Sequence, residues 1–114
     1  MSFKIQNPSV NQTKNLINYN NKVDTVNGAG QTISASTFST SVVNTGTAYS
    51  VTLPNPLYAG QIKNITVADS TSGTSATITI NLKTAPNFTT TNYTLNGIGD
   101  MIELFGTTQG WAEW

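Results

Sequence analysis

The stretch that decides the fold reads Tyr49-Ser-Val-Thr-Leu53, then Pro54-Asn-Pro-Leu-Tyr-Ala-Gly-Gln61, then Ile62-Lys-Asn-Ile-Thr-Val67. Its first part alternates apolar and polar residues, which is the period of a half-buried β-strand. Pro54 and Pro56 then fix φ and lack a backbone N–H, and Gly60 tolerates positive φ, so the middle part predicts an ordered corner. Ile65 and Val67 fall on one face of a second strand. The stretch therefore predicts a strand, a corner and another strand.

The size and charge of the chain exclude several classes of protein. A chain of 114 residues is one domain on length, and a domain of this size buries roughly two-thirds of its unfolded surface. Five lysines balance five acidic residues, so no basic cluster is present to bind nucleic acid or anionic lipid. No apolar run approaches the roughly 20 residues that span a bilayer, and the N-terminus lacks the apolar segment of a signal peptide. We expect no nucleic-acid partner and no membrane partner.

The polar residues of this chain are mostly uncharged. Charged residues make up 9% of the sequence, against an average near 25%. Twenty threonines, fourteen asparagines and ten serines take their place; threonine suits the exposed face of a strand and asparagine suits turns. Such a composition is typical of secreted, cell-surface and virion-exposed β proteins.

The N-terminal part differs in composition from the rest. Residues 1–26 are rich in Asn, Gln and Lys, and the turn signal Asn27-Gly28-Ala29-Gly30 follows them. We expect an extended N-terminal arm over residues 1–26 and a β domain over residues 27–114. Two interpretations of the arm stay open: a loosely packed tail, or a segment that orders against a neighbouring subunit or surface. In the second, the assembly contacts are Phe3, Ile5, Leu16 and Ile17.

The pattern of the β domain predicts an all-β fold. Strand signals recur about every 8 to 12 residues, which is the spacing of a sandwich or barrel. The clearest strand is 76–82, in which Ala76, Ile78, Ile80 and Leu82 alternate with polar residues. Residues 101–105 form a more continuous apolar strand that we expect to be covered on both faces. The predicted fold is an antiparallel β-sandwich or barrel of six to eight strands, jelly-roll-like, and strand order stays open.

The residues that common catalytic sites require are missing. The chain has no histidine and no cysteine, which removes Ser-His nucleophiles, thiol chemistry and the common zinc sites. Asp100 and Glu103 are close in sequence, but their spacing in a strand puts them on opposite faces. No run of oxygen ligands fits calcium. We expect a non-enzymatic protein without catalytic residue, metal, cofactor or small-molecule substrate.

The aromatic residues allow three interpretations. Trp111 and Trp114 can close the core and hold the C-terminus in place. Trp111 and Tyr93 can instead be exposed and stack on a sugar. The third interpretation is burial at a subunit interface, where Trp and Tyr are enriched.

Two parts of the chain carry a family resemblance. The first is Val51-Thr-Leu53-Pro54 with Ala59-Gly60-Gln61 and Ile65-Thr-Val67; the second is Leu95-Asn-Gly97, Gly99-Asp100-Met-Ile102-Glu-Leu104 and Gly110-Trp111. Together they resemble small β modules in structural proteins of tailed phages and large double-stranded DNA viruses. These modules occur as capsid decoration (cement) proteins and in fibre or spike proteins, and many assemble as trimers. The resemblance covers about residues 47–114.

The resemblance implies a virion structural protein at the capsid surface, most readily a decoration or cement protein. Its partners would be copies of itself, as a homotrimer, and a major capsid protein or another virion protein. The second hypothesis is a carbohydrate- or receptor-binding module of a fibre or cell-surface protein, with an extracellular location.

Overall fold

A computed structural model describes residues 22–71, 75–83 and 90–113. Within these ranges the chain forms eight strands and no helix. The strands are β1 (Val23–Val26), β2 (Ser39–Asn44), β3 (Tyr49–Leu53), β4 (Ile62–Ser70), β5 (Ile78–Leu82), β6 (Asn92–Leu95), β7 (Met101–Thr107) and β8 (Gly110–Glu113). The all-β class and the expected number of strands are confirmed.

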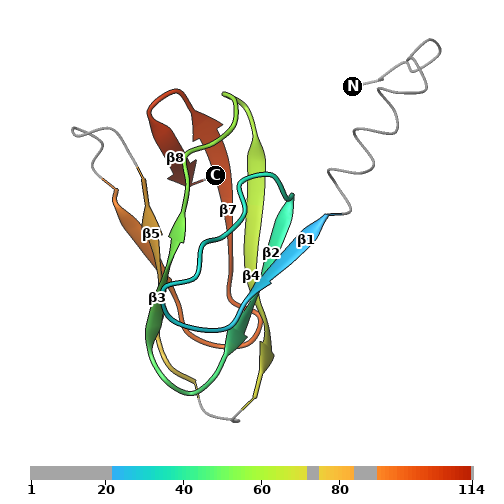
Figure 1. Ribbon diagram of the computed structural model, residues 1–114, viewed down its shortest axis with the longest axis vertical. Helices are drawn as coiled ribbons and strands as arrows, with labels where there is room; N and C mark the ends of the chain where they lie inside the picture. The colour runs from blue at the N-terminus through green and yellow to red at the C-terminus, as the bar shows by residue number, and fades with distance from the viewer. Residues whose placement is uncertain (1–21, 72–74, 84–89, 114) are drawn as a thin grey trace, which may run out of the picture.

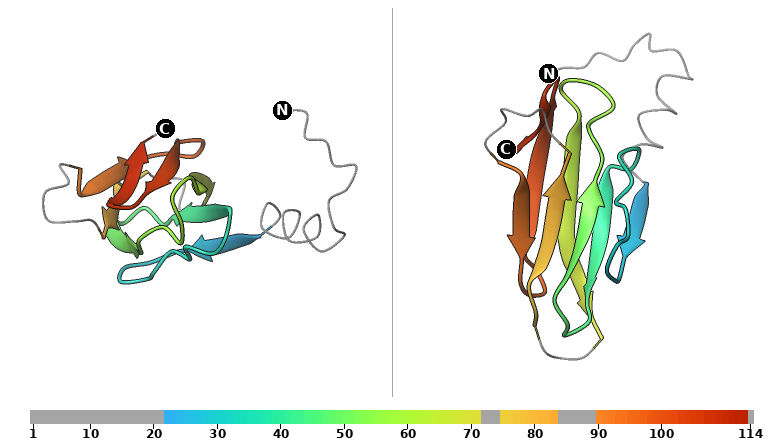
Figure 2. Two further views of the ribbon diagram at one scale, coloured as in Figure 1. Left: turned by 90° about the horizontal axis from the view of Figure 1, so that it is seen from above. Right: turned by 60° about the vertical axis from the view of Figure 1, so that its left-hand side comes forward.

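The strands form two open sheets that face each other (Figures 1 and 2). One has five strands in the order β1-β2-β4-β7-β8, and the other has three in the order β3-β5-β6. The two-layer arrangement agrees with a sandwich, and neither sheet closes into a barrel. The corner predicted between residues 54 and 61 joins β3 in one sheet to β4 in the other.

The prediction of a purely antiparallel fold is wrong. The pairs β1–β2, β2–β4 and β3–β5 are parallel, whereas β4–β7, β5–β6 and β7–β8 are antiparallel. The reason is that the chain crosses to the other sheet after each of its early strands and then returns. A strand that returns after such a crossing runs in the same direction as the previous strand of its sheet. The jelly-roll arrangement is therefore not confirmed.

The early part of the chain winds as a short coil. Between β1 and β2, residues 30–33 bond to β3 through Gly30 N to Ser50 O (3.0 Å), Thr52 N to Gln31 O (3.1 Å) and Ile33 N to Thr52 O (2.8 Å). Three successive segments, residues 23–33, residues 39–53, and residues 62–71 with 75–82, then each contribute to the five-stranded sheet first and to the three-stranded sheet second. We call them coils one, two and three. The antiparallel strands β6, β7 and β8 follow them.

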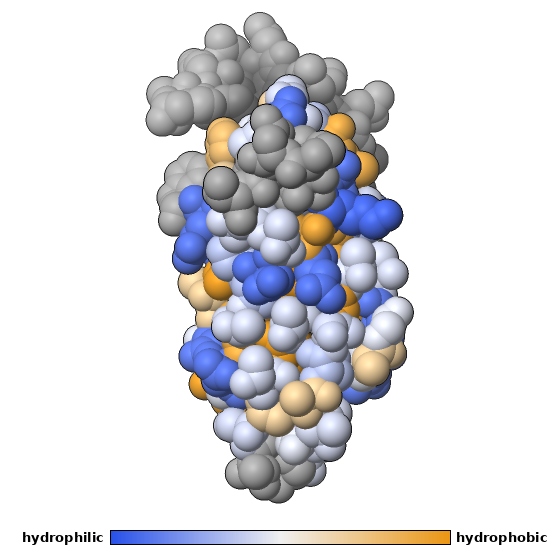
Figure 3. All heavy atoms as spheres, turned by 90° about the vertical axis from the view of Figure 1, so that its left-hand side faces the viewer, coloured by the Kyte–Doolittle hydropathy of each residue, from blue (hydrophilic) through white to orange (hydrophobic). Residues whose placement is uncertain are grey.

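The core lies between the sheets and is built by alternation along each strand. Val26, Val42 and Val67 are neighbours across β1, β2 and β4, and all three are buried. Ile78 and Ile80 point inward from β5, as expected, and Thr79 does not. The outer face of the three-stranded sheet is mostly hydrophilic (Figure 3). Its outward-pointing side chains, none of which is charged, are Ser50, Thr52, Thr79, Asn81, Asn92 and Thr94.

Three boundaries differ from the sequence prediction. The sheet begins at Val23, four residues before the domain boundary expected at residue 27, and Val26 belongs to the core. Strand β5 begins at Ile78 rather than at residue 76. Strand β7 is not covered on both faces, because Met101 and Phe105 are exposed on its outer side.

Candidate functional site

The corner between β3 and β4, residues 54–61, is held in place at both of its ends. At its start, the buried indole of Trp111 donates from Nε1 to the carbonyl oxygen of Pro54, at 2.7 Å. At its end, the buried side chain of Gln61 accepts from the backbone N–H of Leu57 (2.7 Å) and donates from Nε2 to Ala35 O (2.6 Å). The corner is therefore a defined structure, as its prolines predict.

The middle of the corner lies directly on β7. Gly60 N donates to Gly106 O at 2.8 Å, and Gly106 N donates to Gln61 O at 2.7 Å. A Cβ atom on Gly106 would lie 2.8 Å from the Cβ atom of Pro56 and 2.9 Å from the carbonyl oxygen of Tyr58. Only glycine leaves room for this approach. Gly60, with φ of 91°, adopts the positive value that the sequence predicted for it.

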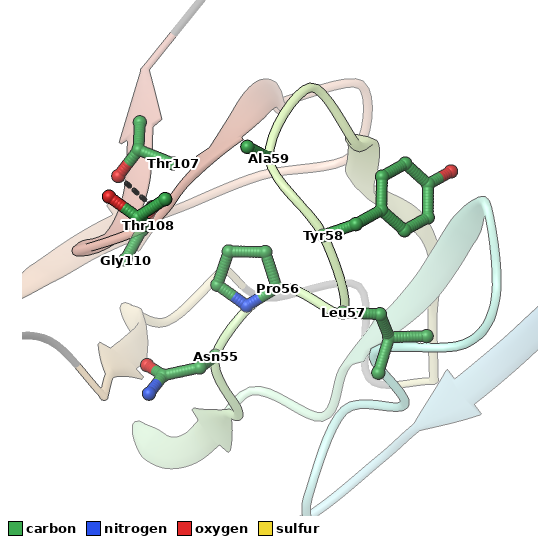
Figure 4. Close-up of a pocket in the computed structure, with 8 residues that line it drawn as sticks. All are labelled: Asn55, Pro56, Leu57, Tyr58, Ala59, Thr107, Thr108 and Gly110. Carbon is green, nitrogen blue, oxygen red and sulfur yellow. Dashed lines mark hydrogen bonds between the residues drawn. The ribbon is translucent and has the colours of Figure 1, made fainter.

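This well-held corner exposes two large apolar side chains. Leu57 is 61% exposed and Tyr58 is 55% exposed. Figure 4 shows both pointing to one side of the corner, away from Thr107 and Thr108. The exposed face of Phe105 lies on the outer side of β7, opposite Ile62 of β4 and next in sequence to the glycine under the corner. We call Leu57 and Tyr58 the apolar corner.

A pocket of about 340 Å³ lies on the other side of the same corner, facing the β7–β8 turn (Figure 4). It is lined by residues 55–59 together with Thr107, Thr108 and Gly110, and none of them is charged. The Thr107 hydroxyl already donates to Gly110 O at 2.7 Å. The other polar side-chain groups of the lining residues are the amide of Asn55 and the hydroxyls of Thr108 and Tyr58, and the Tyr58 hydroxyl points away from Thr107 and Thr108.

A buried ion pair joins the first residues of β4 to β1. The Lys63 side chain is 0% exposed, and its Nζ lies 3.5 Å from Asp24 Oδ1 on β1. Its three N–H donors match three acceptors: Ser34 O (2.8 Å), Thr37 O (3.0 Å) and Thr37 Oγ1 (2.6 Å). The charge of Lys63 thus holds the segment between coils one and two against β4.

The carboxylate of Asp24 is held by hydroxyl and backbone donors as well. The hydroxyls of Thr37 and Thr40 donate to Oδ1, both at 2.6 Å, and Ser34 N donates to Oδ2 at 3.0 Å. Burial raises the pKa of Asp24, but these hydrogen bonds and the charge of Lys63 outweigh burial, so its pKa is lowered. Burial lowers the pKa of Lys63 to about 8, although Asp24 opposes the shift. The cluster is an internal support of the fold.

The opposite end of the sandwich has its own buried polar support. Asn44, at the end of β2, donates from Nδ2 to Ala76 O (2.9 Å) and Asn96 O (2.6 Å). Its Oδ1 accepts from Gly46 N (3.0 Å) and Ala76 N (3.2 Å). The buried polar side chains described here are thus engaged in joining loops to sheets. Asn44 and Lys63 use all of their side-chain hydrogen-bonding groups in these contacts.

The residues proposed from sequence fall in different places. Trp111 is 0% exposed and belongs to the buried core, so neither face of its ring is open to solvent. Tyr93 is half-buried against the core, and burial, with a smaller contribution from Glu113, raises the pKa of its hydroxyl. The expected assembly contacts Phe3, Ile5, Leu16 and Ile17, and also Trp114, lie outside the described residues.

The two neighbouring carboxylates do not form a pair. Asp100 precedes β7 and accepts hydrogen bonds from Asn96 N (2.8 Å) and Gly97 N (3.2 Å), which lower its pKa. Glu103 lies within β7, opposite Asn64. Asp100 is therefore the cap of the β6–β7 turn.

Sequence reasoning did not find the Asp24–Lys63 pair or the buried Asn44. The alternation along the strands could have indicated both. Lys63 lies two and four residues before Ile65 and Val67, and Asn44 lies two residues after Val42, so each falls on the buried face of its strand. Residues at such positions point inward whatever their polarity.

The described part of the chain contains no helix long and apolar enough to cross a membrane. Within residues 22–71, 75–83 and 90–113, no three His, Cys, Asp or Glu side chains gather where a metal ion could bind.

Comparisons with models of known families, with curated proteins and with solved structures found no match for this chain.

Proposed function

We propose that this protein is a virion structural protein, a capsid decoration subunit without enzymatic activity, that associates with copies of itself and with a shell protein. One observation carries the proposal: Leu57 and Tyr58 are more than half exposed on a corner that several hydrogen bonds hold in place. A contact surface that is already ordered loses little conformational entropy when it binds. The resemblance to phage and viral β modules supplies the biological setting.

The chemistry of the interior supports a structural role in preference to catalysis. Lys63, Asn44 and Gln61 are the groups that a buried active site would use, and each is engaged in joining a loop to a strand. The outward-pointing side chains of strands β3, β5 and β6 are uncharged, so this face offers no electrostatic attraction to a charged partner. Association through the apolar corner is therefore the contact that this surface favours.

Solution mass tests the proposal. We expect the wild-type protein to form a homotrimer by light scattering on a sizing column. Changing both Leu57→Asp and Tyr58→Asp should dissociate it, since burying two such side chains contributes about 3 kcal/mol, or roughly a hundredfold in the association constant. The matched control is Thr79→Asp with Asn81→Asp on the outer face of the three-stranded sheet, which should leave the trimer intact.

Two outcomes would contradict assembly through the apolar corner. A wild-type protein that is monomeric at every concentration, both alone and with capsids, would contradict assembly altogether. Equal dissociation by the control pair would show that added charge, rather than loss of the corner, breaks the complex. Circular dichroism should show the same β spectrum for all variants.

The pocket beside the corner supports a second candidate function, the binding of a neutral, hydroxylated ligand such as a carbohydrate. Its volume of about 340 Å³ falls within the range of small-ligand sites, roughly 300 to 1,000 Å³. Its uncharged wall offers the Asn55 amide and the Thr108 hydroxyl as hydrogen-bonding groups. This site replaces the sugar platform expected at Trp111, whose ring is buried.

A titration with neutral monosaccharides, followed by NMR chemical shifts, tests the second candidate. Shifts should concentrate at residues 55–59 and 107–110. Asn55→Ala with Thr108→Val should weaken binding by about tenfold or more, because two hydrogen bonds are lost and each contributes roughly 0.5 to 1.5 kcal/mol. Ser50→Ala on the outer face of β3 serves as the control. Shifts elsewhere, or none at all, would remove this candidate.

A further inference from the structure

The chain contains two Asn-Gly dipeptides, and each lies in a turn that follows a strand. Asn27-Gly28 follows β1, and Asn96-Gly97 follows β6. Both asparagines are exposed. The side-chain carbonyl carbon of such an asparagine is open to attack by the next backbone nitrogen, because glycine has no side chain to hinder ring closure. The two turns therefore offer the same chemistry in different surroundings.

The turn at Asn96-Gly97 holds the attacking nitrogen in a hydrogen bond. Gly97 N donates to Asp100 Oδ2 at 3.2 Å, and Asn96 N donates to the same oxygen at 2.8 Å. The asparagine is also held by its two oxygens: Asn96 O accepts from Asn44 Nδ2 (2.6 Å), and Asn96 Oδ1 accepts from Thr77 Oγ1 (3.0 Å). Attack by Gly97 N would first have to break its bond to the Asp100 carboxylate.

The turn at Asn27-Gly28 leaves the corresponding nitrogen available. In the part of the chain that the structure describes, no hydrogen bond engages the Gly28 N–H. The space beside Gly28 is also open: a Cβ atom there would have no neighbour within 4 Å, whereas one on Gly97 would lie 3.5 Å from Ser75 Oγ. Water and a rearranging backbone therefore have access to Gly28.

The side chain of Gln31 holds Asn27 and polarises its carbonyl group. Gln31 Nε2 donates to Asn27 Oδ1, and Asn27 N donates to Gln31 Oε1, both at 2.8 Å. Attack on the side-chain carbonyl carbon places negative charge on Oδ1, and a donor already aimed at that oxygen stabilises the charge as it develops. Gln31 is itself anchored, since Thr52 N donates to Gln31 O at 3.1 Å. This turn thus combines an available nucleophile with an oriented donor.

We propose that Asn27-Gly28 is a site of self-modification, at which the folded chain converts Asn27 into an aspartyl residue, and that Asp100 protects Asn96 from the same reaction. The Gly28 nitrogen loses its proton to water and forms a bond to Asn27 Cγ. The bond between Cγ and Nδ2 then breaks, and Nδ2 takes up a proton and leaves as ammonia. Water opens the resulting cyclic imide to aspartate or isoaspartate. The net reaction consumes one water molecule and releases one ammonia molecule, with no oxidant or reductant.

The two products affect the turn differently. Aspartate at position 27 keeps an oxygen that accepts from Gln31 Nε2, so this product fits the turn. Isoaspartate adds a carbon atom to the main chain between β1 and residues 30–33, which bond to β3. Either product gives a negative charge to a chain of zero net charge, next to the edge strand β1, where charge opposes pairing with a further strand. This inference does not depend on the proposed function.

Peptide mapping of the full chain by mass spectrometry tests the proposal. In heavy-oxygen water at neutral pH, aspartyl product should form at residue 27 at least about fivefold faster than at residue 96, the effect of one net hydrogen bond. Gln31→Glu keeps the acceptor for Asn27 N and removes the donor to Oδ1, so it should slow conversion of Asn27 by about fivefold. Asp100→Ala should speed conversion of Asn96 by a similar factor.

The same chain unfolded in urea is the matched control, because both dipeptides then lie in a flexible backbone and should convert at nearly equal rates. Equal rates in the folded protein would overturn the proposal. A difference that persists in urea would place its cause in the neighbouring sequence and not in the fold. Unchanged conversion of Asn27 in Gln31→Glu, or of Asn96 in Asp100→Ala, would contradict the roles of these two side chains, provided that circular dichroism shows the variants folded.

Discussion

Replacing Lys63 with methionine is expected to lower the free energy of unfolding by about 3 kcal/mol, because removing one member of a buried ion pair leaves its partner uncompensated. The Lys63 side chain is fully buried and satisfies the carbonyl oxygens of Ser34 and Thr37. Methionine fills similar space but donates no hydrogen bond. Urea unfolding followed by circular dichroism measures the loss, and Lys83→Met, at an exposed lysine, should change stability by no more than about 0.5 kcal/mol.

A double variant identifies the source of this loss. Asp24→Asn together with Lys63→Met removes both charges, so the double variant should lose less stability than the sum of the two single variants. Additive losses would mean that the two side chains contribute independently. A Lys63→Met protein as stable as the wild type would contradict the buried charge.

The same pair predicts a dependence on pH with a defined sign. Burial lowers the pKa of Lys63 in the folded protein from 10.5 to about 8, so the unfolded chain binds more protons than the folded protein between these values. Stability rises with pH wherever the unfolded state binds more protons. The wild type should therefore gain stability from about pH 8 toward pH 10, and Lys63→Met should lack this gain.

The parts of the fold that sequence predicted are those that depend on local chemistry. The alternation in residues 49–53 and 62–67 predicts strands, and the prolines with Gly60 predict the corner, because φ restrictions and side-chain parity act within a few residues. The direction of strand pairing was missed. A half-buried strand shows the same alternation whether its neighbour is parallel or antiparallel, so only the crossings between sheets decide it.

The candidate site was predicted in part for the same reason. The corner was predicted, but its contact with β7 was not, because Gly106 lies far along the chain and meets the corner only in the folded sheet. Asp24 and Lys63 meet across β2. Predicting that contact requires knowing that β1, β2 and β4 are neighbours in this order, and no local sequence pattern gives the strand order.

Replacing Trp111 with alanine should have a still larger effect, a loss of about 3 to 5 kcal/mol, which is typical of removing a buried large aromatic side chain. Its ring is 0% exposed within the core, and Nε1 donates to Pro54 O at 2.7 Å. The substitution therefore opens a cavity and leaves the carbonyl at the start of the corner without its donor. The corner should loosen along with the core, so the proposed trimer should also dissociate.

Two further variants separate the cavity from the hydrogen bond. Trp111→Phe keeps an aromatic ring and removes the donor, so it should cost less than Trp111→Ala, with about 1 to 3 kcal/mol attributable to the unpaired carbonyl. Tyr58→Ala removes an exposed aromatic side chain from the same corner, so it should leave the unfolding midpoint of the monomer almost unchanged. If Trp111→Ala proved as mild as Tyr58→Ala, the ring could not be part of the core, and sugar stacking at Trp111 would again be a valid hypothesis.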